Sequence, residues 1–260
     1  MPELPEVAHA AAVLERAALG RTITGLRLFH AALRRRVAPA ELRRLRGRRV
    51  ERVERRGKHQ LLVLDDGSAL HVHFRMSGDW LIACAADPPA RFARAALDLD
   101  DGSRVTLVDP RALATMAVHR DGSAALPSLG PEPHDPSLGA AYLRAALAGR
   151  RGAIKPELLD QRVVAGLGNI YVAEALWLAR ISPWAAARSL STARLERLIA
   201  AMRDTIERAR AEPGRYGSES GQPMAVYDRE GSPCPRCGAK VRRATQAGRS
   251  TYYCSRCQRR

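Results

Sequence analysis

The first three residues, Met1, Pro2 and Glu3, place a carboxylate beside a residue that can become a nucleophilic amine. If Met1 is removed, Pro2 carries a free secondary amine, and an α-amino group titrates near pH ~8, so part of it is unprotonated at neutral pH. A secondary amine that attacks an aldehyde-like carbon forms an iminium, which accepts electrons without a metal or an organic cofactor. The alternative is that Pro2 is only tolerated after Met1 and that Pro5 and Glu6 begin an ordinary helix.

Four of the five cysteines form two short pairs, Cys234 with Cys237 and Cys254 with Cys257, separated by sixteen residues. This spacing is typical of a structural site in which four thiolates surround one tetrahedral Zn²⁺. Disulfides are the alternative, but the sequence has no export signal, and a reducing compartment keeps thiols free. We therefore expect one structural zinc ion. The fifth cysteine, Cys84, follows an apolar run and is expected to be a small buried side chain.

The segment from Cys234 to the C-terminus is strongly basic, with eight Lys or Arg residues and no acidic residue. It is too short to form a core of its own, so the metal must organise it. We expect a zinc ribbon whose hairpin displays basic side chains toward phosphates, namely Lys240, Arg242, Arg243 and Arg249. The alternative is a ribbon that serves only as a structural cap.

Residues 158–171 predict a helix, a turn that contains Gly166 and Gly168, and a second helix capped by Asn169. Glycines let the backbone approach a ligand closely, and the free N–H groups at a helix start attract an anion. A plain helical hairpin explains the same residues. Because the basic ribbon follows in the chain, we favour a phosphate as the anion.

The elements that must position these residues change in type along the chain. Residues 5–19 predict a helix that ends at Gly20, and apolar or alternating runs then predict strands at 23–29, 50–55, 60–64, 69–74, 95–99 and 104–108. Hairpin turns are expected at 65–67 and 100–102, both Asp-Asp-Gly. A mostly antiparallel β-sandwich with an N-terminal helix therefore occupies residues 1–130.

Helical patterns replace strand patterns after a proline-rich linker at residues 126–136. They cover residues 138–147, 155–163, 169–180 and 192–211, followed by a Gly- and Ser-rich loop at 212–222. We expect a helical domain at 138–225 and the zinc ribbon at 226–260. The fold class is therefore α+β with several domains.

The charge of the chain indicates a polyanionic partner. The 43 Lys and Arg residues outnumber the 27 Asp and Glu residues and give a net charge of +16. No apolar run of ~18 residues, signal peptide or lipidation motif is present, so we expect no membrane partner. Nucleic acid is the expected partner.

Several motifs occur together in a consistent order: residues 2–6, Gly57-Lys58, residues 73–78, 109–111 and 166–171, and the four cysteines. In these motifs the sequence resembles, over essentially its whole length, the formamidopyrimidine-DNA glycosylase and endonuclease VIII family of bacterial base-excision repair enzymes. The resemblance implies an N-terminal β-sandwich, a helix–two-turn–helix domain and a zinc finger.

The resemblance also implies a role for each matching residue. Pro2 would attack the sugar C1′ of a damaged nucleotide flipped out of the duplex, and β,δ-elimination would then cut the strand on both sides. Glu3 would exchange protons at the deoxyribose, and Lys58 would bind a nearby phosphate. The matching DNA contacts are Asn169 and Arg249 on phosphates, Lys155 on the nearby backbone, Glu6 in the lesion pocket, and Met76, Arg111 and Leu113 as wedge residues.

Two departures from the family pattern leave the preferred lesion open. The third wedge residue is usually Phe in the formamidopyrimidine branch, whereas this chain has Leu113. Residues 212–225 also lack the Thr-Thr-Leu-x-Asp type of segment with which that branch covers 8-oxoguanine. Opposite-base discrimination and the removal of Met1 are likewise open.

Three functions are compatible with these residues. We favour a bifunctional DNA glycosylase and abasic-site lyase that excises oxidised purines (8-oxoguanine and formamidopyrimidines). The alternatives are an endonuclease VIII-like enzyme that prefers oxidised pyrimidines and a zinc-ribbon DNA-binding protein without catalysis. The expected partner is double-stranded DNA with oxidised bases or abasic sites, bound by a monomer in the bacterial cytoplasm at the nucleoid.

His71 and His73 alternate along one expected strand face. A metal-binding pair is one interpretation and ordinary strand packing is the other. We favour packing because the sequence around the pair shows no third ligand.

Overall fold

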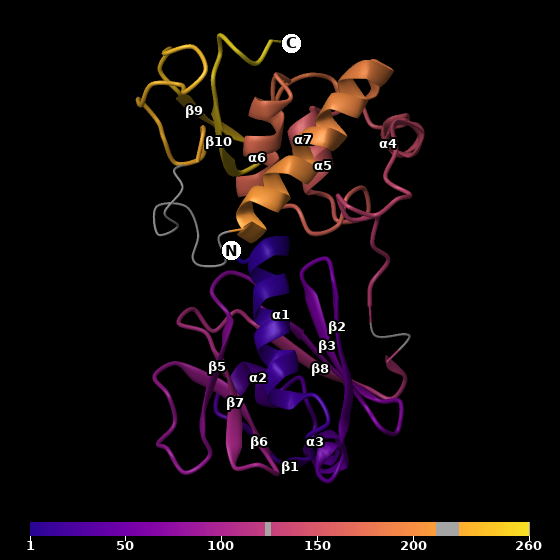
Figure 1. The fold of residues 1–260 in the computed structure, drawn as a ribbon, viewed down its shortest axis with the longest axis vertical. Helices are drawn as coiled ribbons and strands as arrows, with labels where there is room; N and C mark the ends of the chain where they lie inside the picture. Colours follow the sequence, from indigo (N-terminus) through magenta and orange to yellow (C-terminus); the bar gives the residue numbers. More distant parts are fainter. Residues whose placement is uncertain (123–125, 212–223, 260) are drawn as a thin grey trace. The chain divides into compact units, whose positions relative to one another are not determined.

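A computed structural model describes residues 1–122, 126–211 and 224–259 (Figure 1). The chain divides into two compact units, which we describe separately. The first contains residues 1–2 and 6–127, and the second contains residues 3–5 and 128–260.

The first unit is an antiparallel β-sandwich. One sheet has the order β1-β6-β7-β5 and the other β2-β3-β4-β8. The strands of the first sheet are β1 (Ile23–Leu28), β6 (Ala93–Leu99), β7 (Ser103–Val108) and β5 (Asp79–Cys84). Those of the second are β2 (Val50–Arg56), β3 (His59–Leu64), β4 (Ala69–His73) and β8 (Thr115–His119). The expected β-sandwich is therefore confirmed.

One hydrophobic core joins the two sheets, because alternate residues of each strand point inward. Leu62 and Val72 of the second sheet share this core with Leu97 and Leu107 of the first. Helix α1 (Leu4–Ala18) contributes a stripe of apolar residues at helical spacing to this core. Two short helices, α2 (Ala31–Arg34) and α3 (Pro39–Leu45), contribute one buried residue each, Leu33 and Leu45.

The prediction of a buried Cys84 was wrong, since its side chain is exposed. Cys84 ends β5, which lies at the edge of its sheet and buries only Trp80. An apolar run in an edge strand does not need to be buried on both faces. Strand β8 and the helices α2 and α3 were not expected, and the two helices are too short to establish a clear period.

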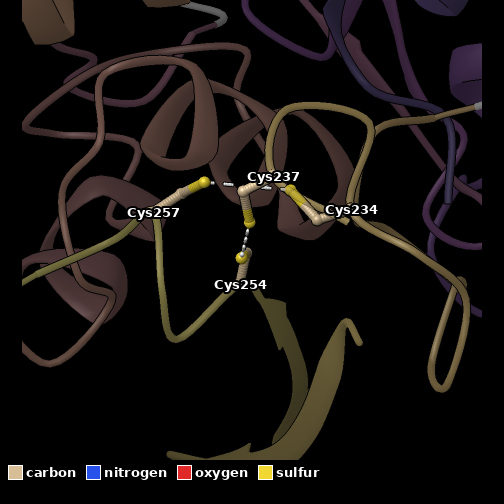
Figure 2. Close-up of side chains that lie close together, drawn as sticks. All are labelled: Cys234, Cys237, Cys254 and Cys257. Atoms are coloured by element: carbon tan, nitrogen blue, oxygen red, sulfur yellow. Dashed lines mark hydrogen bonds between the residues drawn. The ribbon is translucent and has the colours of Figure 1, made fainter. Parts of the chain in front are cut away.

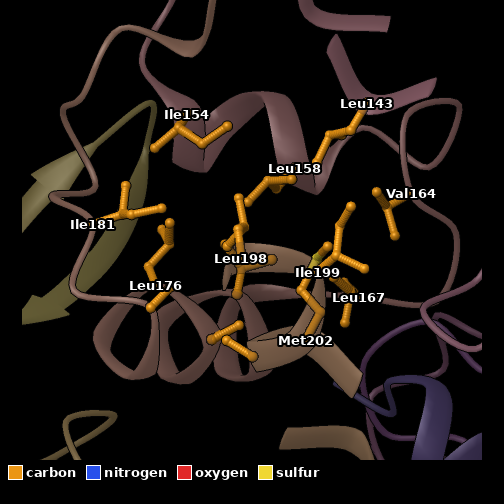
Figure 3. Close-up of a cluster of buried hydrophobic side chains, with 14 of the residues drawn as sticks. Leu143, Ile154, Leu158, Val164, Leu167, Leu176, Ile181, Leu198, Ile199 and Met202 are labelled. Atoms are coloured by element: carbon orange, nitrogen blue, oxygen red, sulfur yellow. The ribbon is translucent and has the colours of Figure 1, made fainter. Parts of the chain in front are cut away.

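In its described residues, the second unit has four α-helices around one core. Figure 3 shows side chains of this core. The helices are α4 (Ala140–Leu147), α5 (Ile154–Leu159), α6 (Asn169–Leu178) and α7 (Thr192–Ala211), with the short 3₁₀ helix η2 (Ala187–Ser189) before α7. Leu143, Leu158, Leu176 and Leu198 bring all four helices into contact with this core. Residues 170–176 of α6 are all buried, so α6 is the central helix of the unit.

The same unit ends in the zinc ribbon, whose hairpin consists of β9 (Arg242–Gln246) and β10 (Arg249–Tyr253). Ala247 and Gly248 form the two-residue turn, and both have positive φ, as a type I′ turn requires. Val226, Val241 and Tyr252 form a small core with Ala173 of α6. The loop expected at 212–222 lies outside the described residues. Within the described ranges, we find no helix of the length and apolarity needed to cross a membrane.

Candidate active site

The carboxylate of Glu3 occupies the start of helix α6. Glu3 is 1% exposed. Its Oε2 accepts hydrogen bonds from the N–H groups of Gly168 (2.6 Å) and Tyr171 (3.3 Å), and its Oε1 accepts one from Ile170 (2.9 Å). These donors have no partner inside the helix, and the helix dipole favours a negative charge at this end. The anion at the start of α6 is therefore the chain's own Glu3.

This arrangement corrects two expectations about the turn. Asn169 was expected to cap the helix, but Gly168 is the N-cap residue and Asn169 is the first residue of α6. A phosphate was expected at the free N–H groups, but Glu3 already accepts from three of them. A carboxylate satisfies these donors as well as a phosphate does, and sequence distance does not prevent it from reaching them.

Gly166 brings the N-terminal segment to this turn. Its φ is +90°, and a Cβ at this position would lie 2.4 Å from Cδ1 of Leu4. The N–H of Leu4 donates to the Gly166 carbonyl at 2.9 Å. The backbone at Gly166 is therefore closely approached, as expected, but the group that approaches it is the chain's own Leu4 and not a ligand.

We expect Gly166→Ala to lower the free energy of unfolding of the second unit by about 1–3 kcal/mol, because it adds backbone strain and a clash with Leu4. Urea unfolding followed by circular dichroism measures the change. Gly149→Ala is the matched control, since its added Cβ meets nothing within 4 Å. Equal effects of the two substitutions would contradict the proposed packing.

Pro2, the candidate nucleophile, is buried and is preceded by a half-buried Met1. With Met1 in place the Pro2 nitrogen is an amide, so its chemistry depends on the removal of Met1. Glu6 lies in the first turn of α1 and is half-buried.

Two helices of the second unit hold the ribbon hairpin near its turn, at Ser250. Lys155 of α5 is 1% exposed, and its Nζ donates to the Ser250 carbonyl (3.0 Å) and to Oγ1 of Thr251 (2.6 Å). The Nδ2 of Asn169 donates to the same carbonyl at 3.0 Å. Burial, together with the charge of Arg249, lowers the pKa of Lys155 to about 8. Lys155 and Asn169 thus fix the residue next to the exposed Arg249.

We expect Lys155→Met to weaken DNA binding about tenfold, because a hairpin that loses two hydrogen bonds positions Arg249 less well. Fluorescence anisotropy with an abasic-site duplex measures the affinity. In an Arg249→Ala background the same substitution should have a much smaller effect. Additive losses would instead indicate that Lys155 contacts DNA independently of Arg249.

Asp109 organises the two loops of the first unit that carry the candidate wedge residues Met76, Arg111 and Leu113. It is completely buried, and its carboxylate accepts a short hydrogen bond from the Ser77 hydroxyl. It also accepts from the N–H groups of Arg111 (3.1 Å), Leu113 (2.7 Å) and Ala114 (2.7 Å). Burial alone would raise the pKa of Asp109, but these hydrogen bonds outweigh it and hold the pKa below its usual value.

The candidate wedge residues lie on loops with backbone strain. Met76 is 39% exposed and Leu113 is 44% exposed, which is unusual for large apolar side chains. Arg75, beside Met76, and Ala112, between Arg111 and Leu113, both have positive φ. Strain of this kind persists only where the surroundings impose it, and it is concentrated at functional sites. Asp109 therefore fixes the conformation of the loops that carry these side chains, a role that its position in the sequence does not indicate.

Lys58 lies in the two-residue turn between β2 and β3, and it is 5% exposed. Gly57 precedes it with φ +58°, as the first position of a type II′ turn requires. The Gly57-Lys58 pair is therefore a turn signature as well as a candidate phosphate contact.

The four ribbon cysteines lie together as a metal site requires (Figure 2). Their Sγ atoms are all within 4.8 Å of one another, with Cys237 and Cys254 3.5 Å apart and Cys234 and Cys257 3.9 Å apart. Thiolates on one tetrahedral Zn²⁺ are about 3.8 Å apart, given Zn–S distances of ~2.3 Å. The expected structural zinc site is confirmed.

Trp177 of α6 supports this site, although it lies far from the four cysteines in the sequence and no local motif points to it. Its Nε1–H donates to the Sγ of Cys234 at 3.3 Å. The guanidinium of Arg236 lies 4.1 Å from the centre of the Trp177 ring. Burial opposes ionisation of Cys234, but the hydrogen bonds from Trp177 and from the backbone lower its pKa to about 6.

We expect Trp177→Phe to reduce zinc affinity by about 10-fold or more, because it removes the hydrogen bond to a ligand while keeping an aromatic ring. Competition with a chromogenic chelator measures the affinity. Trp184→Phe is the control, since Trp184 packs against Tyr253 and donates no hydrogen bond to a cysteine among the described residues. An unchanged affinity in Trp177→Phe would show that the hydrogen bond does not stabilise the thiolate.

Comparison with known families matches the chain in three consecutive parts. Residues 1–116 match the formamidopyrimidine-DNA glycosylase N-terminal domain, residues 129–218 match the formamidopyrimidine-DNA glycosylase H2TH domain, and residues 231–260 match the zinc finger found in FPG and IleRS. A β-sandwich, a helical domain and a four-cysteine zinc finger of these types define a DNA-repair glycosylase.

Individual relatives are similar to this chain over nearly its whole length. A formamidopyrimidine-DNA glycosylase of Chloroflexus aurantiacus is 41% identical, over 99% of this chain and 98% of the relative. The MutM (FPG) protein of Thermus thermophilus has a TM-score of 0.86 at 36% identity, over 99% of this chain and 98% of that one. Lactococcus lactis Fpg, in a complex with DNA that contains an abasic site, has a TM-score of 0.91 at 29% identity, over 99% and 100%. The chain belongs to the formamidopyrimidine-DNA glycosylase family.

Proposed function

We propose that the chain is a bifunctional DNA glycosylase and abasic-site lyase that excises oxidised purines, 8-oxoguanine and formamidopyrimidines, from double-stranded DNA. The observation that carries the proposal is the position of Glu3. A buried carboxylate with three backbone donors directly follows Pro2, the one residue that can supply a secondary amine.

In this proposal Pro2, freed from Met1, attacks C1′ of the flipped nucleotide, the bond to the damaged base breaks, and the sugar opens to an iminium. The iminium acidifies the neighbouring C2′ proton, so that β- and then δ-elimination cut the strand. Proton transfers at the sugar are assigned to Glu3. Its three hydrogen bonds hold the carboxylate in one orientation, so little reorganisation is needed when it acts.

The DNA contacts are assigned in the same way. Met76, Arg111 and Leu113 would fill the gap left by the flipped nucleotide, which suits their exposure on loops fixed by Asp109. Phosphates are assigned to Lys58, Asn169 and Arg249, and Lys155 would act on DNA by holding the hairpin. Glu6 is assigned to the lesion pocket. Because all these contacts come from one chain, we assign the activity to a monomer acting at the bacterial nucleoid.

Borohydride reduction tests this chemistry against a binding protein without catalysis. Correctly processed protein, with loss of Met1 verified by intact mass, is incubated with an abasic-site duplex and reduced. We expect a covalent protein–DNA adduct, and peptide mapping should place it on Pro2. The absence of any adduct from processed protein would overturn the proposed enzyme mechanism.

A panel of single-lesion duplexes tests the preference for oxidised purines. We expect faster excision of 8-oxoguanine opposite cytosine than of thymine glycol. Leu113, in the place of the usual Phe, is the observation that keeps the pyrimidine alternative open, since an aliphatic wedge stacks less well than an aromatic one. Faster excision of thymine glycol would assign the chain an endonuclease VIII-like preference.

A further inference from the structure

Four of the seven histidines lie on one face of the sheet β2-β3-β4-β8, and the proposed function uses none of them. We call this group the histidine face; its members are His59 on β3, His71 and His73 on β4, and His119 on β8. His59 is paired with His73, and His119 with Ala69. Alternation along the strands places all four on the side opposite to Leu62, Leu70 and Val72 of the core.

The closest nitrogens of this face come from neighbouring strands. Nδ1 of His59 lies 2.8 Å from Nε2 of His71, and the two ring centres are 5.0 Å apart. The ring of His119 lies 5.7 Å from that of His71. Two imidazoles bound to one ion have ring centres roughly 5 Å apart, because each nitrogen lies ~2 Å from the metal. The 2.8 Å contact is a hydrogen bond between the two rings and is shorter than the ~3.3 Å between two nitrogens on a tetrahedral ion. A metal ion at this point would therefore replace the shared proton and move the two nitrogens slightly apart.

His73 is excluded from such a site by its hydrogen bond. Its Nδ1 lies 2.9 Å from the backbone N–H of Arg75 and accepts from it. A neutral imidazole that bound a metal through Nε2 would carry its proton on Nδ1 and could not accept this bond. The pair His71 and His73, which the sequence presented as alternating neighbours, is therefore not the metal pair.

His119 contributes a second, independent observation. Its Nε2 is buried and has no hydrogen-bond partner within the part of the chain that the structure describes. Buried polar atoms without a partner are rare and indicate a ligand or a water molecule. His119 is therefore available to complete a site beside His71.

We propose that His59 and His71 bind one divalent metal ion of the zinc type through Nδ1 and Nε2, respectively, with His119 as a third ligand after rotation of its side chain. Imidazole ligands select Zn²⁺ over Mg²⁺ or Ca²⁺, which prefer oxygen. The positive charges of Lys58 and Arg75 act on these rings and weaken cation binding, so the ion is held less tightly than the ribbon zinc. The proposal does not depend on the proposed function.

The test uses the full-length protein with its ribbon zinc in place. After dialysis against micromolar free Zn²⁺ we expect two zinc ions per chain by elemental analysis. The His71→Phe and His59→Gln variants should each hold one. His73→Gln on the same face and the exposed His9→Gln should both still hold two.

Nitrogen NMR of the wild-type histidine rings gives a readout that does not depend on any variant. On addition of the second equivalent of Zn²⁺, Nδ1 of His59 and Nε2 of His71 should move to metal-bound shifts, while both nitrogens of His73 stay unchanged. One zinc per chain in the wild type, or a second zinc that survives both His59→Gln and His71→Phe, would overturn the proposal. Loss of the second zinc ion in the His73→Gln variant would also overturn the proposal.

Discussion

Protein that keeps Met1, for example behind an uncleaved N-terminal tag, will bind an abasic-site duplex but will not be trapped on it by borohydride. The nitrogen of Pro2 is then an amide whose lone pair is delocalised, so it cannot attack C1′. Loss of a covalent nucleophile typically costs more than about 10³-fold in rate, and we expect incision to fall by at least this factor. Denaturing gels with a labelled duplex measure both the adduct and the incision.

The control is the same tagged protein after the tag has been cleaved so that Pro2 becomes the first residue. It differs from the inactive form only at the N-terminus, and it should recover both trapping and incision. Because all other residues are unchanged, the comparison separates the chemistry of Pro2 from DNA binding and from stability. Undiminished incision by the tagged protein would show that another nucleophile acts.

Removal of zinc will abolish tight DNA binding by unfolding the ribbon. The ribbon core contains only a few apolar side chains, and the free energy of binding a structural zinc ion, about 10–16 kcal/mol in small zinc domains, is also its folding energy. Without zinc, β10 no longer holds Arg249 and Ser250 in place. We expect the affinity for an abasic-site duplex to fall by about 100-fold or more, since several phosphate contacts are lost together.

A matched pair of cysteine variants measures this effect without a chelator. Cys254→Ser removes one of the four ligands, whereas Cys84→Ser changes an exposed thiol at the end of β5 in the other unit. The first should lose ribbon zinc and DNA affinity, and the second should keep both. Wild-type affinity in a Cys254→Ser protein shown to lack ribbon zinc would contradict the role assigned to the ribbon.

Local patterns in the sequence predicted a large part of the fold. The apolar spacing of residues 5–19 and 192–211 predicted α1 and α7, because a helix buries one stripe of its surface. The spacing of the four cysteines predicted the zinc site, because each pair of ligands lies within one tight turn. Each of these features depends on residues that are close together in the chain.

Features that join distant segments could not be predicted in this way. Asn169 is a good N-cap residue by type, yet Glu3 takes the donors at the start of α6 from more than 160 positions away. Lys155 resembles a surface cation in the sequence, but its Nζ is buried against the ribbon hairpin. The alternation of His71 and His73 suggested a pair within one strand, whereas the closest nitrogens belong to His59 and His71 on neighbouring strands.

The sequence by itself therefore determined the chemical groups of this protein: an amine at Pro2 once Met1 is removed, the carboxylate of Glu3, and four thiolates spaced for zinc. Only the tertiary structure decided which of these groups meet. The physical reason is that backbone N–H groups at a helix start and carbonyl groups in a hairpin are the same in every sequence. Which side chain satisfies them depends on how the chain packs, and here packing selected Glu3 for α6 and Lys155 for Ser250.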